Sequence, residues 1–214
     1  MDLVWGAFQY IMHNRAAFSE AMRTHLELSG SALLIGLLIS IPLGIICARH
    51  ARLSVMIMGM VNSLRVVPSL AILIIVMPIL GTGYTPALVA LTILSCPPIL
   101  INTFLGIKSV DHEVIESAIG MGMDNRQILF RIELPLALPL ILSGVRTASV
   151  EVISSATLAA FIGGGGLGTF IINGLGLYNF AVLLAGAIPV ALFAICSEVV
   201  FGIIEKLATK YRQA

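Results

Sequence analysis

The chain has 214 residues, of which 58% are hydrophobic and only 11% are charged. A soluble domain of this size could not bury so much apolar surface, so the composition predicts a protein whose solvent is the lipid bilayer. The formal net charge of +1 lacks the basic excess that a nucleic-acid partner would require, and nucleic-acid binding is not expected.

Residues 1–27 precede the first long apolar run. Charged residues interrupt them and no basic region precedes an apolar run, so a cleavable signal sequence is not expected. Trp5, Phe8 and Met12 recur at helical spacing, which predicts an interfacial helix over residues 3–22. A poorly ordered leader is the alternative that the sequence leaves open.

Five stretches are apolar over the roughly 20 residues that a membrane span needs. They are Leu28–Ala48, Met56–Leu80, Ala87–Ile107, Leu138–Ile162 and Phe180–Ile204. The second is longer than needed and contains Asn62 and Arg65, so part of it is expected to form a separate or tilted piece. The pattern predicts an all-α membrane protein with five transmembrane helices.

The orientation follows from the placement of the basic residues. With the N-terminus outside, eight of the twelve lie in inner segments, two lie outside (Arg15 and Arg23) and two lie in the membrane (Arg65 and Arg146). This predicts an N-out, C-in topology. One large cytoplasmic loop is then expected at about residues 108–137, and residues 206–214 form a cytoplasmic tail.

The loop at about 108–137 contains the signals for two short helices. Asp111 can cap the first, and glycines near Gly122 would end it. Asp124 and Gln127 have the spacing of a capping box for the second. Two short helices joined at a glycine would form a compact element that another protein could grip. An ordinary solvated hairpin between two spans is the alternative.

The second short helix is expected to cover Asn125–Glu133 and to be closed by Pro135. Seven residues of the loop form a spaced motif: an acidic residue with two small ones, a glycine six residues after the acid, and an Ile-x-Leu-Pro segment. They are Glu116, Ser117, Ala118, Gly122, Ile132, Leu134 and Pro135. This pattern resembles the EAA loop of ABC importer permeases, and Ser117 in place of the first alanine is its only departure.

The resemblance covers roughly residues 28–205. Segments outside the loop resemble the osmoprotectant branch, whose members are permeases for glycine betaine, carnitine or choline. These segments are residues 68–71, 101–103, 133–136, 144–147 and 161–168. The resemblance implies a type I ABC importer permease (MetI-like) domain in the bacterial plasma membrane. A methionine-type permease, which also has five spans, is the alternative within the family.

The resemblance also implies that the loop docks on a cytoplasmic ATPase. Its first four motif residues would lie at the contact, and the last three would anchor the second helix to the membrane body. No lysine of the chain follows a glycine, so a Walker A phosphate loop is absent from the sequence. ATP and Mg²⁺ are therefore expected in the partner ATPase, and no cofactor, metal or catalytic site is expected here.

Two further partners are expected: a second permease, identical or sibling, and an extracytoplasmic substrate-binding protein. The fourteen aromatic residues are spread without clustering, whereas a quaternary ammonium is usually held by an aromatic cage. Selectivity is therefore expected to reside mainly in the separate binding protein.

Polar residues recur along one face of the predicted fourth span. They are Ser143, Thr147, Glu151, Ser154 and Ser155, which fall on one stripe of a helix. A carboxylate against lipid is costly, so Glu151 should face protein or water. The stripe predicts a translocation path, and hydrogen bonding that only packs the helices is the alternative.

Two charged residues lie at similar depths in the fourth and fifth predicted spans. Arg146 and Glu198 are about eight and seven residues from the cytoplasmic ends of their spans, which predicts a structural ion pair between the two helices. A substrate site is the alternative.

A glycine run follows the fourth span, and it predicts a tight re-entry of the chain at the outer mouth. In the family that this chain resembles, the corresponding surface lies near the external gate. Gly163, Gly165, Leu167 and Phe170 are the expected gate residues.

Two functions from other classes remain as alternatives. An intramembrane enzyme would need a catalytic constellation within the spans, and no histidine lies within any predicted span. An uncoupled channel or secondary transporter would differ from the importer in needing no ATPase.

Overall fold

The computed structural model describes residues 2–210, and it is helical with no strand over that range. The helices are α1 (Asp2–His13), α2 (Arg15–Arg49), α3 (Ala51–Leu64), α4 (Ser69–Leu80), α5 (Tyr84–Lys108), α6 (His112–Gly120), α7 (Asn125–Ile128), α8 (Leu134–Ser155), α9 (Gly168–Gly176) and α10 (Phe180–Lys210). A π-helical turn, Leu129–Glu133, joins α7 to α8, and a 3-10 turn, Leu158–Ile162, follows α8. Residues 211–214 of the expected tail lie outside the described residues.

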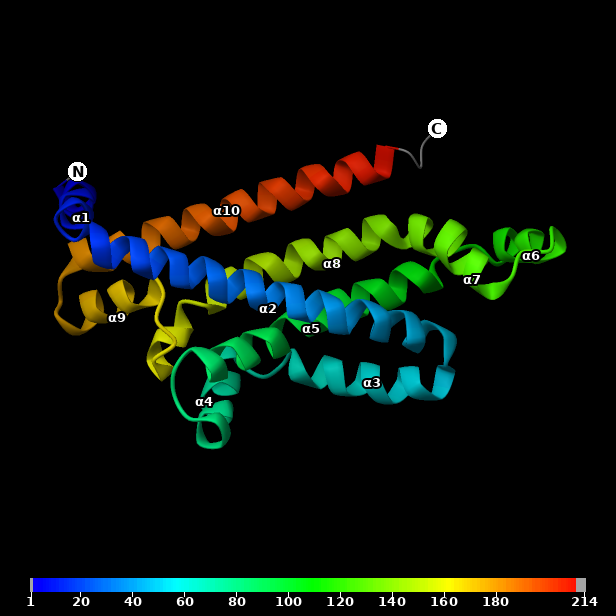
Figure 1. Ribbon diagram of the computed structural model, residues 1–214, viewed down its shortest axis with the longest axis horizontal. Helices are drawn as coiled ribbons and strands as arrows, with labels where there is room; N and C mark the ends of the chain where they lie inside the picture. The colour runs from blue at the N-terminus through cyan, green and yellow to red at the C-terminus, as the bar shows by residue number, and fades with distance from the viewer. Residues whose placement is uncertain (1, 211–214) are drawn as a thin grey trace.

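The long helices run side by side along one axis, as Figure 1 shows. Helix α5 packs between α2 and α8, and α8 in turn packs against α10. Four continuous helical segments are long and apolar enough to cross a membrane: α2, α5, α7 together with α8, and α10. With the bent pair α3 and α4 they make up to five spans in the described part of the chain, which confirms the predicted all-α architecture.

The predicted second span is broken into two helices. Helices α3 and α4 meet at an angle of 102° across residues 65–68. Pro68 has no N–H to donate and adopts φ −57° and ψ 137°, and a proline also disfavours the helical conformation of the residue before it. The separate piece expected within Met56–Leu80 is therefore α3, and α4 turns away from the bundle axis.

Small residues let the central helices approach closely. A Cβ added to Gly44 of α2 would lie 2.8 Å from the Thr103 Cβ of α5, and one added to Gly144 of α8 would lie 2.7 Å from the Pro98 carbonyl oxygen. Such backbone proximity is the usual way in which helices associate tightly in lipid. Helix α5 is therefore held firmly between α2 and α8.

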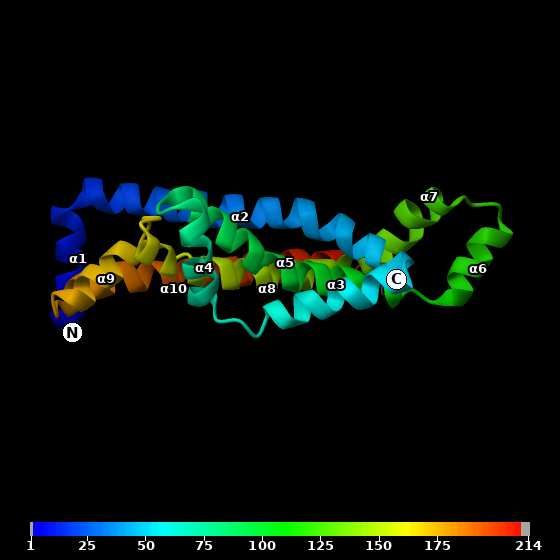
Figure 2. The ribbon, with the colours of Figure 1, turned by 90° about the horizontal axis from the view of Figure 1, so that it is seen from below.

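The N-terminal segment is helical, so residues 2–27 are not a disordered leader. The single helix expected over residues 3–22 is instead divided at Asn14, and α1 lies across the end of the bundle (Figure 2). Trp5 and Phe8 are exposed on α1 and stack with their ring centroids 5.7 Å apart. An exposed aromatic pair on a helix across the bundle end is typical of a membrane interface.

Helix α8 begins and ends at residues other than those predicted. Pro135 does not close the second loop helix: the chain continues through the π-helical turn, and Pro135 lies in the first turn of α8. The π-helical turn interrupts the regular ladder of hydrogen bonds just before Pro135, and such a turn can accommodate a residue that has no N–H to donate. At its other end α8 stops at Ser155 rather than Ile162.

Candidate functional site

The loop helices form a projection at one end of the bundle, here called the knob and comprising residues 111–128 (Figures 1 and 2). The Asp111 carboxylate accepts from the Glu113 amide at 3.0 Å. The Asp124 carboxylate accepts from the Gln127 amide at 2.7 Å, and the Gln127 side chain accepts from the Asp124 amide at 3.0 Å. Both predicted caps are confirmed, so the knob holds its own shape.

The tip of the knob carries exposed apolar side chains beside polar ones. Ile119 is 57% exposed and Met121 is 75% exposed. Ser117 and Glu116 are exposed on the same helix, and the Glu116 carboxylate lies 3.2 Å from Nδ1 of His112. An apolar tip with a polar margin is what a docking surface for another protein presents.

One residue of the predicted docking contact lies elsewhere. Ala118 is fully buried, and its carbonyl accepts from the Met123 amide at 3.1 Å. The chain reverses here because Gly122 adopts φ +82°, a conformation that glycine adopts readily. The side chain of Ala118 therefore shapes the knob from inside and does not lie on its surface.

The base of the knob is tied to α2 by an ion pair. Glu133 ends the π-helical turn and is buried, and its carboxylate lies 2.6 Å from Nη2 of Arg49, the last residue of α2. The same nitrogen lies 3.4 Å from the Asn125 carbonyl oxygen. This contact was missed from the sequence, where its only signal was an acidic residue inside an apolar segment.

Apolar packing adds to this attachment. Leu134 packs against a buried cluster that includes Ala48 of α2 and Ile107 of α5. Ile132 is half-buried, whereas Pro135 is exposed and makes no anchor. Of the three residues expected to anchor the knob, Leu134 does so most clearly.

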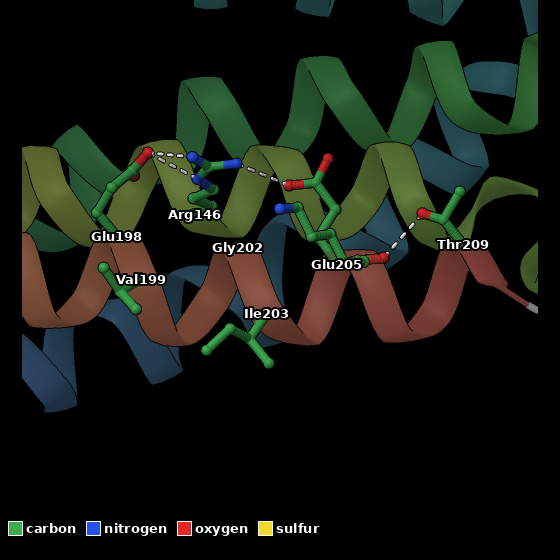
Figure 3. A pocket seen from close by; sticks show the side chains of 8 residues that line it. Arg146, Glu198, Val199, Gly202, Ile203, Glu205 and Thr209 are labelled. Atoms are coloured by element: carbon green, nitrogen blue, oxygen red, sulfur yellow. Dashed lines mark hydrogen bonds and ion pairs between the residues drawn. The ribbon is translucent and has the colours of Figure 1, made fainter.

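An arginine and two glutamates join α8 to α10. The Arg146 Nε donates to Glu198 at 2.8 Å, and Nη2 contacts the same carboxylate. Nη1 donates to Glu205 at 3.2 Å, so the two glutamates flank the guanidinium (Figure 3). The expected pair with Glu198 is present. Glu205, seven residues further along the same face of α10, was missed.

The residues of the polar stripe of α8 differ in their exposure. Thr147, Glu151 and Ser154 are exposed in this chain, Ser143 is half-buried and Ser155 is buried. The end of the stripe meets a cavity, which has a volume of about 320 Å³ and is lined by Glu151 and Ser155 among other residues.

This cavity lies at the break between α3 and α4. Arg65, Pro68 and Ser69 line it from the break, and Leu94 and Pro97 line it from α5. The sequence placed Arg65 in the membrane but gave no reason to place it near α8. The break in α3–α4 is what brings the two together.

The glycine run turns the chain tightly, and the expected gate side chains are part of a core. Gly163 and Gly165 adopt φ +78° and +76°. Leu167 and Phe170 are buried, and the Phe170 ring packs edge-to-face on Phe18 with centroids 6.0 Å apart. Because the N-terminal helices cover them, these two side chains do not line an open mouth in this chain.

A buried histidine was missed. The first span was predicted to begin at Leu28, so no histidine was expected within a span. In the structure α2 begins at Arg15 and includes His25. The His25 Nε2 lies 3.1 Å from the Ile153 carbonyl oxygen. In a regular helix the Thr157 amide would donate to the Ile153 carbonyl, but here it donates to the Ser154 carbonyl. The Ile153 carbonyl is therefore available to His25.

Comparison with known proteins identifies the family. Residues 40–210 match the family of the binding-protein-dependent transport system inner membrane component. The chain belongs to this family. It is therefore a multi-pass component of a bacterial plasma membrane, and its likeness to the ABC importer permeases is confirmed.

The relatives cover nearly the whole chain. The carnitine transport permease protein OpuCB of Listeria monocytogenes is 45% identical over 96% of this chain and 93% of its own length. The choline transport system permease protein OpuBB of Bacillus subtilis (strain 168) is 40% identical over 94% of this chain and 93% of its own. An inward-facing structure of the MetNI methionine ABC transporter has a TM-score of 0.82 at 21% identity, covering 90% of this chain and 96% of that one, and it shows the shared fold.

Proposed function

We propose that this chain is the permease subunit of an ATP-driven importer for a compatible solute such as glycine betaine, carnitine or choline. The relatives named for carnitine and choline transport support this substrate class. The structural observation that carries the proposal is the rigid knob with an apolar tip, fixed by its base to the membrane helices. An element with this structure can transmit movement from an ATPase outside the membrane to the membrane helices.

The knob lies on the cytoplasmic side in this proposal, with the N-terminus outside and the C-terminus inside. The placement of the basic residues supports that orientation. The knob docks on an ABC ATPase through Glu116, Ser117 and the exposed Ile119 and Met121. The ATPase holds ATP and Mg²⁺, and this chain holds no cofactor and performs no hydrolysis.

Movement of the knob reaches the bundle through its base. When ATP closes the ATPase dimer, the knob moves, and the Arg49–Glu133 pair and the packing of Leu134 carry α2 and α8 with it. ATP acts by binding one state of the complex more tightly than the other, which shifts the population between inward-open and outward-open forms. The solute passes along the polar stripe of α8, from Ser143 to Ser155.

Two permeases form the path, and these are two copies of this chain or this chain with a sibling. The substrate-binding protein delivers solute at the opposite end, where α1, α9 and the glycine run from Gly163 lie together (Figure 2). Selectivity resides mainly in that protein.

Reconstituted vesicles test the proposal. This permease, its ATPase and its binding protein are combined, and uptake of radiolabelled glycine betaine, carnitine, choline and methionine is measured with and without ATP. We expect ATP-dependent uptake of at least one quaternary ammonium compound and none of methionine. Uptake by this chain alone, driven by an ion gradient, would contradict the proposal.

A further inference from the structure

The cavity at the α3–α4 break lies midway along the bundle and is open to the surface of this chain, since Arg65, Pro68 and Glu151 in its lining are exposed. Leu94 and Pro97, which line it, are near the middle of the 25-residue helix α5, about 15–20 Å from either end at 1.5 Å per residue. Its volume of about 320 Å³ is that of a small-molecule site. A polar cavity at this depth, formed at a broken helix, is where membrane transporters commonly hold their substrates.

Two opposite charges line this cavity without touching each other. Arg65 comes from the break and Glu151 from α8, and neither takes part in an ion pair within residues 2–210. Both residues line the same cavity, so a ligand within it can lie between the two charges. Charged groups in a membrane protein are normally paired or directed into a water-filled path, and these two are left available.

The polar groups around them are available as well. The Ser69 and Ser155 hydroxyls line the cavity and form no side-chain hydrogen bond in the described part of the chain. Ser69 also begins α4, whose first turn has no side-chain cap, so the positive end of the helix dipole lies beside Arg65. The break thus presents positive charge and α8 presents negative charge.

The α5 wall of the cavity contributes a backbone feature. Pro98 has no N–H, so the Leu94 carbonyl lacks its usual donor within the helix. A carbonyl oxygen without its donor keeps a partial negative charge toward its surroundings. It adds a second negative group to that of Glu151 among the residues that line the cavity from α5 and α8.

A simple ion would be attracted by one side of this cavity and repelled by the other. We propose that the cavity is a transient binding site for a small zwitterion that carries a quaternary ammonium and a carboxylate, with Arg65 and Ser69 binding the carboxylate and Glu151 facing the ammonium. The inference rests on the proposed function and sharpens it. Glycine betaine and carnitine have both groups, whereas choline has only the cation.

The test measures binding to the permease–ATPase complex without the binding protein, by equilibrium dialysis of radiolabelled glycine betaine and choline. We expect saturable binding of glycine betaine, stronger than that of choline. Removal of one charged contact should weaken glycine betaine binding about tenfold or more in Arg65→Gln and in Glu151→Gln. Choline binding should weaken only in Glu151→Gln.

Matched variants separate this site from general damage. Arg65→Lys keeps the charge and should retain most of the binding, which also shows that a change at this position folds. Arg52→Gln, at the other end of α3, and Glu27→Gln, in an exposed pair on α2, should bind as the unaltered complex does.

Two results would overturn the site. One is glycine betaine binding that is unchanged in both Arg65→Gln and Glu151→Gln. The other is a complex that transports with its binding protein present but shows no saturable binding of its own. A complete complex that fails to transport any quaternary ammonium compound with ATP would instead overturn the proposed function.

Discussion

Two arginines within the membrane-spanning part of the molecule have opposite surroundings. Arg146 donates to Glu198 and Glu205, so its donors are engaged by side chains of α10 (Figure 3). Arg65 lies at a helix break, lines a cavity and has no ion-pair partner within residues 2–210. The same residue type therefore joins two helices at one place and is left open to a ligand at the other.

A charge that is paired and a charge that is unpaired have different roles in an apolar protein. Removing one partner of a paired charge leaves the others without compensation and weakens the fold. Removing a charge that has no partner leaves the fold intact and takes away whatever the charge was held ready to bind. Stability and transport should accordingly respond to different arginines.

Arg146→Ala should have the largest effect. It leaves Glu198 and Glu205 without the cation that they share, so the yield and melting temperature of the detergent-purified complex should both fall. The triple variant Arg146→Met, Glu198→Gln and Glu205→Gln should recover most of the stability, because it removes all three charges together. Normal assembly of Arg146→Ala with loss of transport would contradict the structural role given to Arg146.

Arg65→Gln should come next, and it should affect transport rather than stability. ATP-dependent uptake of glycine betaine should fall about tenfold or more, since a charged contact to the carboxylate is lost. The melting temperature should stay near that of the unaltered complex, measured on the same preparation. A large fall in melting temperature would place Arg65 with Arg146 as a structural residue.

Arg49→Ala should have an intermediate effect, on coupling. Without its partner the buried Glu133 no longer holds the knob to α2, so ATP hydrolysis should continue while uptake falls severalfold. The ratio of ATP hydrolysed to solute taken up measures this, and Arg49→Lys should keep the ratio low. An unchanged ratio in Arg49→Ala would show that the ion pair carries no movement.

Ser197→Ala should have the smallest effect. Its hydroxyl donates to Ser149 at 2.8 Å, next to the Arg146 cluster. Hydrogen bonds between membrane helices contribute on average about 0.6 kcal/mol, so the melting temperature should change by a degree or two at most. A fall as large as that of Arg146→Ala would mean that the α8–α10 contact depends on more than its charges.

Local features were predicted from the sequence, and contacts between distant segments were not. The caps at Asp111 and Asp124 depend on residues two or three positions away, so their spacing revealed them. The Arg49–Glu133 pair joins residues 84 positions apart, and no pattern along the chain links them. The Arg146–Glu198 pair was an exception, because matched depth in two spans limited the choice of partner.

The cavity was unpredictable for a related reason. Hydrophobicity made Met56–Leu80 one long span, and Asn62 and Arg65 indicated a separate or tilted piece without showing where or how sharply the chain bends; in the structure the break lies at Pro68. The bend of 102° between α3 and α4 then places Arg65 in the lining of the same cavity as Glu151 of α8. The burial of Leu167 and Phe170 was also not predicted, because the α1 and α2 residues that pack against them begin before the region of the resemblance.

All of these expectations assume that the bundle is moved through the knob, and site-directed crosslinking tests this assumption most directly. Cys47, Cys96 and Cys196 are replaced, Met121→Cys is introduced at the exposed tip, and the complex in membrane vesicles is treated with a short thiol-to-amine crosslinker. We predict a product between this chain and the ATPase, formed from the cytoplasmic face and changed in yield by ATP. Labelling of Met121→Cys from the external face, with no product that contains the ATPase, would contradict the account.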